Sequence, residues 1–200
     1  MNGTSVIVVD DERTIRLGLT ASLESLNVGI TEAVNGEDAL EKLRERNFRL
    51  MLLDLKLPGM DGMEVLRRAR EIRPEMRVIV ITAHGTIENA VDAMKLGAVD
   101  FIQKPFAPSE IRELVSRVID RDAIEEQKAA DYASHFELAK RCIAEKRYDD
   151  AAEHARKASG FDNSRPEAFN LLGVIREIQR DIVDAQKYYR AALALDPAYE

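Results

Sequence analysis

Cysteine is almost absent from this chain of 200 residues, since Cys142 is the only one. A single thiol cannot form an internal disulfide, which favours a reducing compartment. The N-terminus also lacks the charged and then apolar pattern of a signal peptide. No apolar run approaches the roughly 20 residues of a membrane span. Together these absences predict a cytoplasmic protein.

The chain also has no excess of basic residues. Lys and Arg number 29 against 36 Asp and Glu, which gives a formal net charge of -7. Binding to nucleic acid or to an anionic membrane surface needs a basic patch. We therefore expect neither nucleic acid nor a membrane among the partners. The hydrophobic share of 46% is enough for a core, and the length suits one domain of about 120 residues with a smaller one.

Short apolar runs alternate with helical patterns up to about residue 122. The runs are rich in Val, Ile and Leu, as expected of strands that are buried on both faces. Five strands, each followed by a helix, predict an α/β fold with a doubly wound, five-stranded parallel sheet. The five runs are 5–9, 28–33, 50–53, 78–81 and 99–102.

The last third of the chain has no strand-like run and repeats itself. The period of 34 residues is the length of a tetratricopeptide unit, which is a helix–turn–helix. We therefore predict that an all-α helical-repeat domain follows the sheet. The matching pairs, 34 positions apart, are Leu138 with Leu172, Ala139 with Gly173, Ala151 with Ala185, Ala158 with Ala192 and Asp162 with Asp196.

Polar side chains stand where the predicted strands end. Asp10 and Asp11 follow the first strand, Asp54 the third, Thr82 the fourth and Lys104 the fifth. Ligands of doubly wound sheets bind beyond the carboxyl ends of the strands. Clustered carboxylates repel one another, and Mg²⁺ with oxygen ligands relieves that repulsion. A carboxylate held beside Mg²⁺ can attack phosphorus, while the ammonium and the hydroxyl stabilise the phosphoryl group.

Each of these residues also has a purely structural interpretation. Asp10 and Asp11 could cap a helix, and Asp54 could be a turn residue at a strand end. Lys104 and Thr82 alone are ordinary turn and strand residues. Their position favours a site, because all of them fall at the carboxyl ends of strands and none at the opposite edge.

Residues 5 to about 120 resemble a two-component receiver domain, which has the flavodoxin-like or CheY-like fold. The resemblance is strongest to receivers of the nitrogen-regulator group. The matching segments are Val8-Val9-Asp10-Asp11-Glu12, Leu52–Gly62, Ile81–Gly85 and Gly97–Phe106.

The resemblance implies a role for each matching residue. Asp54 accepts a phosphoryl group from a histidine kinase or a phosphotransferase. Asp11 and Asp54 bind Mg²⁺ or Mn²⁺ directly, Asp10 helps through water, and the main-chain carbonyl of Lys56 is a further ligand. Lys104 contacts the phosphoryl group.

The resemblance also implies a switch. Thr82 moves toward the phosphoryl group and Phe101 rotates inward, which shifts a population between two states. The bond between Lys104 and Pro105 is expected to be cis, and such a bond costs little before proline.

Two further positions tune the phosphoryl lifetime in the family, and here they are Lys56 and His84. Neither can orient a hydrolytic water as a carboxylate or an amide would, so we expect a lifetime longer than that of the fastest chemotaxis-type receivers. The alternative for His84 is a solvated loop histidine. Kinase docking in the family uses the first helix and the loop after the fifth strand, where the exposed candidates are Arg13, Thr14, Ile15, Gly18 and Phe106.

These patterns divide the chain into three segments. The receiver covers 1–122, and a helical linker that continues its fifth helix covers 123–131. Two tetratricopeptide-like repeats cover 132–165 and 166–199. The second repeat, up to Pro197, fits closely and the first is weaker. No Gly or Pro lies in 119–132, so one helix is expected from about 109 to 144.

The leading functional hypothesis is a response regulator in which phosphorylation of Asp54 changes protein binding or oligomerisation through the repeats. The alternative is a phosphorelay intermediate or phosphate sink whose repeats serve only localisation or dimerisation. An additional enzyme is disfavoured because 123–200 hold no cluster of catalytic groups. The only chemistry expected is Mg²⁺-dependent phosphotransfer to Asp54 and its autodephosphorylation.

Overall fold

The computed structural model describes residues 4–83 and 87–199 of the chain. The chain divides into two compact units, Met1–Arg121 and Asp122–Glu200. Helix α5 (Pro108–Ala144) contributes to both units and contains the segment expected as a helical linker, 123–131. Each unit has hydrophobic clusters of its own.

The first unit is built on a sheet of five parallel strands. Its elements before α5 are β1 (Ser5–Val9), α1 (Arg13–Leu23), the 3₁₀ turn η1 (Glu24–Leu26), β2 (Gly29–Ala33), α2 (Gly36–Glu45), β3 (Leu50–Leu53), α3 (Gly62–Ile72), β4 (Arg77–Thr82), α4 (Ile87–Lys95) and β5 (Asp100–Gln103). The strand order is β2-β1-β3-β4-β5, and all four neighbouring pairs are parallel. The predicted doubly wound sheet is confirmed, and its order reverses between β1 and β3, where such folds bind ligands.

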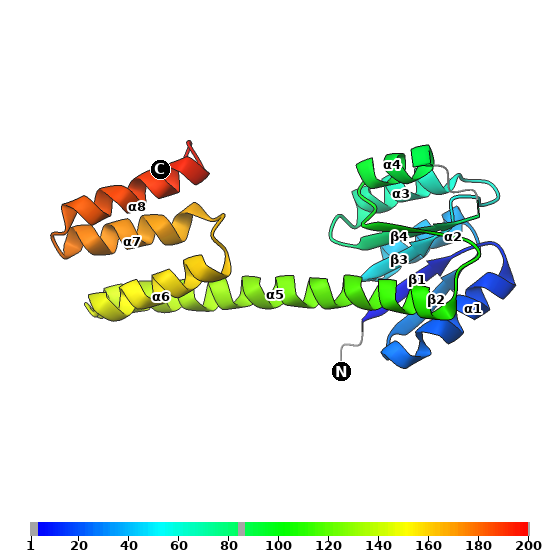
Figure 1. The fold of residues 1–200 in the computed structure, drawn as a ribbon, viewed down its shortest axis with the longest axis horizontal. Helices are drawn as coiled ribbons and strands as arrows, with labels where there is room; N and C mark the ends of the chain where they lie inside the picture. Colours follow the sequence, from blue (N-terminus) through cyan, green and yellow to red (C-terminus); the bar gives the residue numbers. More distant parts are fainter. Residues whose placement is uncertain (1–3, 84–86, 200) are drawn as a thin grey trace. The chain divides into compact units, whose positions relative to one another are not determined.

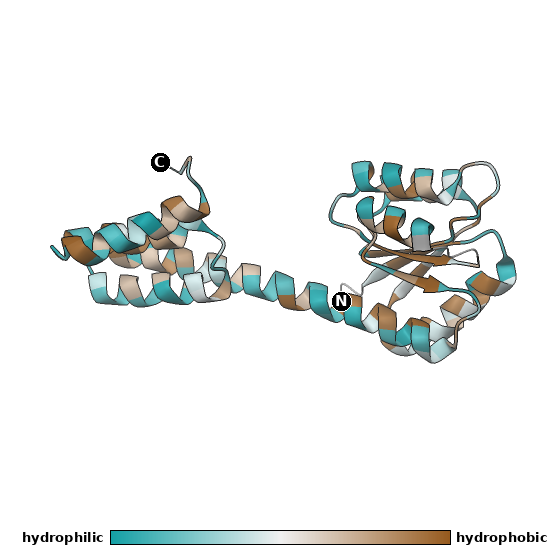
Figure 2. Ribbon diagram, turned by 45° about the horizontal axis from the view of Figure 1, so that its top comes forward, coloured by the Kyte–Doolittle hydropathy of each residue, from teal (hydrophilic) through white to brown (hydrophobic). Residues whose placement is uncertain are grey.

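Successive side chains of the buried strands point to opposite faces of the sheet, and a layer of helices covers each face. Val6 and Val8 belong to the cluster that α1 and α5 cover, whereas Ile7 and Val9 belong to the cluster that α2, α3 and α4 cover (Figure 1). Figure 2 shows the apolar strands between these helices. Because helices cover both faces of the sheet, a ligand site is expected at the carboxyl ends of the strands and not on a face.

The strand boundaries differ slightly from the predicted runs. β4 is longer by Arg77 and Thr82, β2 begins one residue later, and β5 is shifted by one residue. The main-chain N–H of Val99 still donates to the carbonyl of Val78 at 2.8 Å. The predicted start of the strand thus still bonds to β4, and the shift lies within the usual variation at element ends.

The second unit pairs the C-terminal part of α5 with α6 (Tyr148–Phe161), and α7 (Pro166–Ile178) with α8 (Ile182–Leu195). Its turns recur at the spacing seen in the sequence, because Lys146 and Arg180 both have positive φ, 60° and 64°. The N–H of the next residue donates to the carbonyl five positions back in both turns, at 2.8 and 2.9 Å. The all-helical nature of this region is confirmed, and its turn geometry repeats.

Close contacts hold each of these helix pairs together. A Cβ at Gly173 of α7 would lie 2.4 Å from the ring of Tyr189 on α8. The Tyr189 hydroxyl donates to Glu177 at 2.6 Å. Between α5 and α6, the Nδ1 atoms of His135 and His154 lie 3.0 Å apart. Ala139 of α5 and Ala151, Ala152 and Ala155 of α6 are small buried side chains that let these two helices approach closely.

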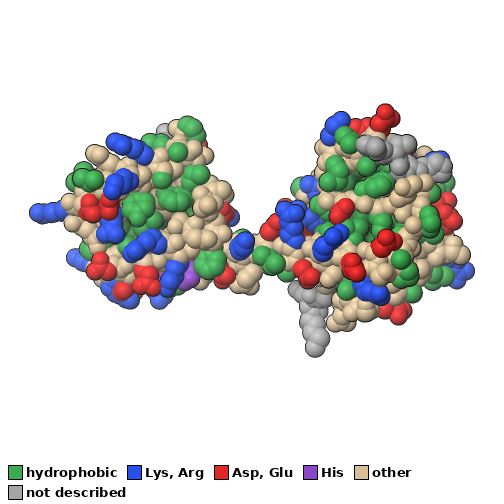
Figure 3. All heavy atoms as spheres, viewed as in Figure 1, with side chains coloured by type: hydrophobic (Ala, Val, Ile, Leu, Met, Phe, Trp, Pro, Cys, Tyr) green, Lys and Arg blue, Asp and Glu red, His purple; other side chains and the backbone are tan. Residues whose placement is uncertain are grey.

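Charged side chains of both signs are intermixed on the face of each unit that Figure 3 shows. Within residues 4–83 and 87–199, none of the helices has the combination of length and apolar character that a bilayer crossing requires.

Candidate functional site

Three carboxylates meet where β1 and β3 end. Asp10 and Asp11 follow β1 directly, and Asp54 follows β3. One oxygen atom from each residue lies within 4.8 Å of the other two. Asp10 and Asp54 are buried, whereas Asp11 is exposed. The structure thus brings together the three carboxylates that the strand ends were expected to gather.

The ammonium group of Lys104 joins this cluster from the end of β5. Its Nζ donates to Asp10 Oδ2 at 2.6 Å and to Asp54 Oδ2 at 2.7 Å. The Lys104–Pro105 bond is cis, as the resemblance implies. The N–H of Lys104 donates to the carbonyl of Thr82 at 2.9 Å, which links the ends of β4 and β5. One ammonium among three carboxylates leaves an excess of negative charge.

Burial and hydrogen bonding shift the pKa values of Asp10 and Lys104. It raises the pKa of Asp10, against the lowering effect of the hydrogen bond from Lys104. Burial lowers the pKa of Lys104, but the hydrogen bonds to Asp10 and Asp54 outweigh it, so the pKa is raised overall. A carboxylate that is costly to keep ionised, as Asp10 is, favours a cation beside it. The donors are hard carboxylate oxygens, so the residues present fit a Mg²⁺ site.

The loop after β3 fixes the position of Asp54. The N–H of Lys56 donates to Asp54 Oδ1 at 3.2 Å, and the Lys56 side chain is exposed. A Cβ at Gly62 would lie 2.4 Å from the carbonyl oxygen of Asp54 and 2.4 Å from Cα of Leu55. Only glycine permits such a close backbone approach. Gly62 was part of the matched motif but had no predicted role. The metal-binding role of the Lys56 carbonyl stays a prediction.

The two proposed switch residues lie on neighbouring strands. Thr82 ends β4 and is 1% exposed. Phe101 is half-buried in β5, lies in register with Val80, and packs against the cluster covered by α2, α3 and α4. The structure shows one arrangement of both side chains, so their coupled movement stays a prediction. His84 lies outside the described residues, and its effect on the phosphoryl lifetime also stays a prediction.

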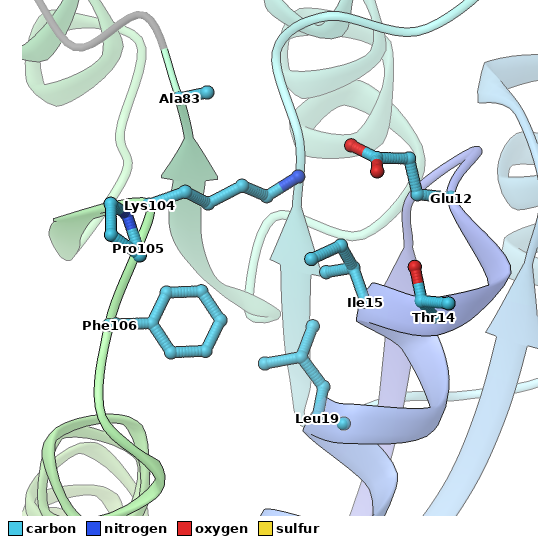
Figure 4. A pocket seen from close by; sticks show the side chains of 9 residues that line it. Glu12, Thr14, Ile15, Leu19, Ala83, Lys104, Pro105 and Phe106 are labelled. Atoms are coloured by element: carbon cyan, nitrogen blue, oxygen red, sulfur yellow. The ribbon is translucent and has the colours of Figure 1, made fainter.

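A groove of about 380 Å³ opens beside the acidic cluster. Figure 4 shows Ile15 and Leu19 of α1 facing Phe106, with the Lys104 side chain extending above them. Of the five residues expected to contact a kinase, Thr14, Ile15, Gly18 and Phe106 line the groove. Arg13 is not part of its lining.

Arg16 is a buried cation of α1 that had no predicted role. Its guanidinium donates to the main-chain carbonyls of Asp10 and Asp11 and to the Glu32 carboxylate. A charged residue beside the apolar face of a helix is normally exposed. The hydrophobic pattern of α1 therefore does not predict that Arg16 is buried. Its burial depends on Glu32 of β2.

A family model for the response regulator receiver domain matches residues 6–116. The chain therefore belongs to the response regulator receiver domain family. Helices α6, α7 and α8 lie beyond the matched segment. The predicted receiver is confirmed, whereas the tetratricopeptide assignment stays a prediction.

Several characterised regulators are similar to this chain. Transcriptional regulatory protein ResD of Bacillus subtilis is 46% identical over 117 residues, which are 58% of this chain and 47% of that protein. Transcriptional regulatory protein FixJ of Bradyrhizobium diazoefficiens is 33% identical over 57% of this chain and 56% of its own length. Sporulation initiation phosphotransferase F of B. subtilis is 35% identical over 60% of this chain and 96% of its own length. The chain thus spans about half the length of the first two relatives.

Solved receiver structures share the fold. The CheY-like receiver of Methanospirillum hungatei has a TM-score of 0.58 and 31% identity, and it covers 60% of this chain and 96% of its own. The receiver domain of NtrX from Brucella abortus has a TM-score of 0.55 and 35% identity, over 57% of this chain and 98% of its own.

Proposed function

We propose that this chain is a response regulator of a two-component phosphorelay whose phosphoacceptor is Asp54. The donor is a histidine kinase or a phosphotransferase. The observation that supports this most strongly is the meeting of Asp54 with Asp10, Asp11 and Lys104 at the carboxyl edge of a receiver sheet. The groove lined by Thr14, Ile15, Gly18 and Phe106 lies beside that cluster and offers the donor a docking surface.

Asp54 is the nucleophile in this proposal. One of its carboxylate oxygens bonds to phosphorus while the bond from phosphorus to the donor imidazole breaks, and the imidazole keeps the electron pair. Lys104, whose Nζ lies 2.7 Å from Asp54 Oδ2, counters the charge of the phosphoryl oxygens. Asp11, Asp54 and the main-chain carbonyl of Lys56 would hold Mg²⁺, with Asp10 helping through water, and the ion would add positive charge beside those oxygens. Later hydrolysis of the acyl phosphate regenerates Asp54, and we propose no other enzymatic activity.

The second unit is the output in this proposal. The turn that recurs after 34 residues and the close α7–α8 contact at Gly173 support two tetratricopeptide repeats. Such repeats bind proteins or peptides. Phosphorylation of Asp54 would change that binding, or the assembly of a homodimer, by shifting the population of the switch.

The second candidate is a phosphorelay intermediate or phosphate sink. The similarity to sporulation initiation phosphotransferase F favours this candidate, because the match covers 96% of that protein. In that case Asp54 passes its phosphoryl group on, and the repeats serve only localisation or dimerisation.

Labelling with acetyl phosphate and Mg²⁺ tests the phosphoacceptor. The Asp54→Asn variant should take up no label, while Asp61→Asn, at the exposed N-cap of α3, should be labelled as wild type is. Labelling of Asp54→Asn at the normal rate would exclude this site.

Pull-downs with and without beryllofluoride then separate the two candidates, because unchanged binding to the repeats excludes the effector role.

A further inference from the structure

One buried guanidinium holds the main chain of the acidic turn. Nη1 of Arg16 donates to the carbonyl oxygen of Asp10 at 2.8 Å and to that of Asp11 at 3.0 Å. Nε of Arg16 donates to Glu32 Oε2 at 2.9 Å. The Arg16 side chain is 9% exposed. The rigid, planar fork of the guanidinium allows these three bonds to form together.

The carbonyls and the carboxylates of the turn have different partners. The Asp10 carboxylate accepts from Lys104 Nζ at 2.6 Å and from the N–H of Glu12 at 2.9 Å. Its carbonyl accepts from Arg16. The first turn of α1 has no side-chain cap, since Glu12 at the N-cap makes no capping hydrogen bond. Arg16 therefore fixes this turn through its carbonyl groups, whereas a cap would accept from the free N–H groups of the helix.

The anchor of Arg16 is itself fixed. Glu32 lies in β2, in register with Val8 of β1. Lys42 of α2 donates to the carbonyl of Glu32 at 2.7 Å and to Asp38 at 2.8 Å. A chain of polar contacts thus runs from α2 through the edge strand to the acidic turn. Withdrawing a guanidinium from water is costly unless it is fully paired, and this network provides the pairing.

We propose that Arg16 is a positioning residue that keeps the Asp10 and Asp11 carboxylates gathered around Asp54. The inference rests on the proposed function of Asp54 and adds a residue that touches neither the metal nor the phosphoryl group. Removing a group that orients metal ligands typically weakens metal affinity about 10- to 100-fold. We expect the loss of Arg16 to weaken divalent-cation binding about tenfold by the same effect.

Direct Mn²⁺ binding to the full, unphosphorylated chain, followed by electron paramagnetic resonance, tests the proposal. Arg16→Met should bind Mn²⁺ about tenfold more weakly than wild type. Arg16→Lys should be intermediate, because a single ammonium cannot span both carbonyls and Glu32. The matched control is Arg44→Met, which removes the same charge from an exposed position of α2, and it should bind Mn²⁺ as wild type does.

Wild-type Mn²⁺ affinity in a folded Arg16→Met protein overturns the proposal, even if its unfolding temperature falls, because that is the result of a merely structural role. If Arg16→Met does not fold, Arg16→Lys and Glu32→Gln carry the test, and wild-type affinity in both overturns it. Labelling of the wild type with acetyl phosphate separates the two proposals. An unlabelled wild type contradicts the role of Asp54, whereas a labelled wild type with unchanged Arg16 variants contradicts only the role of Arg16.

Discussion

The Asp10 carboxylate has opposite effects on metal binding and on the stability of the metal-free fold. Burial raises its pKa in the folded chain. An acid whose pKa is higher in the folded than in the unfolded state costs stability above the folded pKa. That cost disappears as the pH falls below the unfolded value of about 3.9. At neutral pH and without a metal, the Asp10 carboxylate is therefore destabilising despite its bond to Lys104.

We accordingly predict that Asp10→Asn stabilises the metal-free protein. Urea denaturation in EDTA at pH 7 should show a gain of about 1–2 kcal/mol in the free energy of unfolding. Addition of Mg²⁺ should stabilise the variant less than the wild type, because a ligand is lost. Asp61→Asn is the matched control and should change little in either condition. A variant less stable than wild type in EDTA would contradict this prediction.

Gly62 and Gly18 are expected to respond in opposite ways to replacement by alanine. A Cβ at Gly62 meets the backbone of Asp54 and Leu55 at 2.4 Å, whereas a Cβ at Gly18, within α1, meets nothing within 4 Å. Gly62→Ala should lower the free energy of unfolding by about 1–3 kcal/mol. Gly18→Ala should raise it by up to about 1 kcal/mol, since alanine favours a helix interior. Urea denaturation of both variants measures this, and equal effects would show that the loop at Asp54 can yield.

At the scale of elements, Tyr132 of α5 shares a buried cluster with Ala158 of α6 and Ala168 of α7. It is 3% exposed, stacks on Phe136 and lies under the Arg165 guanidinium. Burial, with a smaller effect from Glu167, raises its pKa to about 12. An unfolded tyrosine ionises near 10. The folded state therefore retains the proton between about pH 10 and 12, so the contribution of Tyr132 is present below pH 10 and is lost as the pH rises through this range.

The Tyr132→Phe variant should escape this alkaline loss. Between pH 8 and pH 11, wild type should lose about 1 kcal/mol more of the free energy of unfolding than the variant does. Urea denaturation at both pH values, followed by helical circular dichroism, measures the difference. Identical losses in the two proteins would mean that Tyr132 ionises in the folded unit as freely as in the unfolded chain.

The elements show which parts of the molecule the sequence could predict. The strands were predictable because runs such as Leu50–Leu53 are apolar on both faces, and the carboxylates because they follow those runs directly. The cis bond at Lys104–Pro105 was predictable only through the resemblance. The burial of Arg16 was not predictable, because it depends on Glu32, which is brought to α1 by strand pairing. Local patterns determine elements, whereas contacts between distant residues require the fold.

For the whole molecule, α5 is the part of the chain that belongs to both units. The receiver match ends at residue 116 and the second unit begins at Asp122, and both positions lie within Pro108–Ala144. A signal that passes along the chain from Asp54 to the helix pairs must therefore pass through this helix. Ala129 and Ala130 lie in its exposed middle part. All of 123–130 is exposed, so helix propensity is expected to contribute much of the stability of the helix there.

Replacing Ala129 and Ala130 together by glycine should uncouple the two units. Each glycine weakens the helix by about 1 kcal/mol. We expect acetyl phosphate to label the double-glycine protein as it labels wild type, because the site at Asp54 is unchanged. The beryllofluoride-dependent change in sedimentation or in partner pull-down should be lost. The double-glutamine protein is the control, because glutamine favours helix and should preserve the response. A full response in the double-glycine protein would mean that the signal reaches the second unit without a continuous α5.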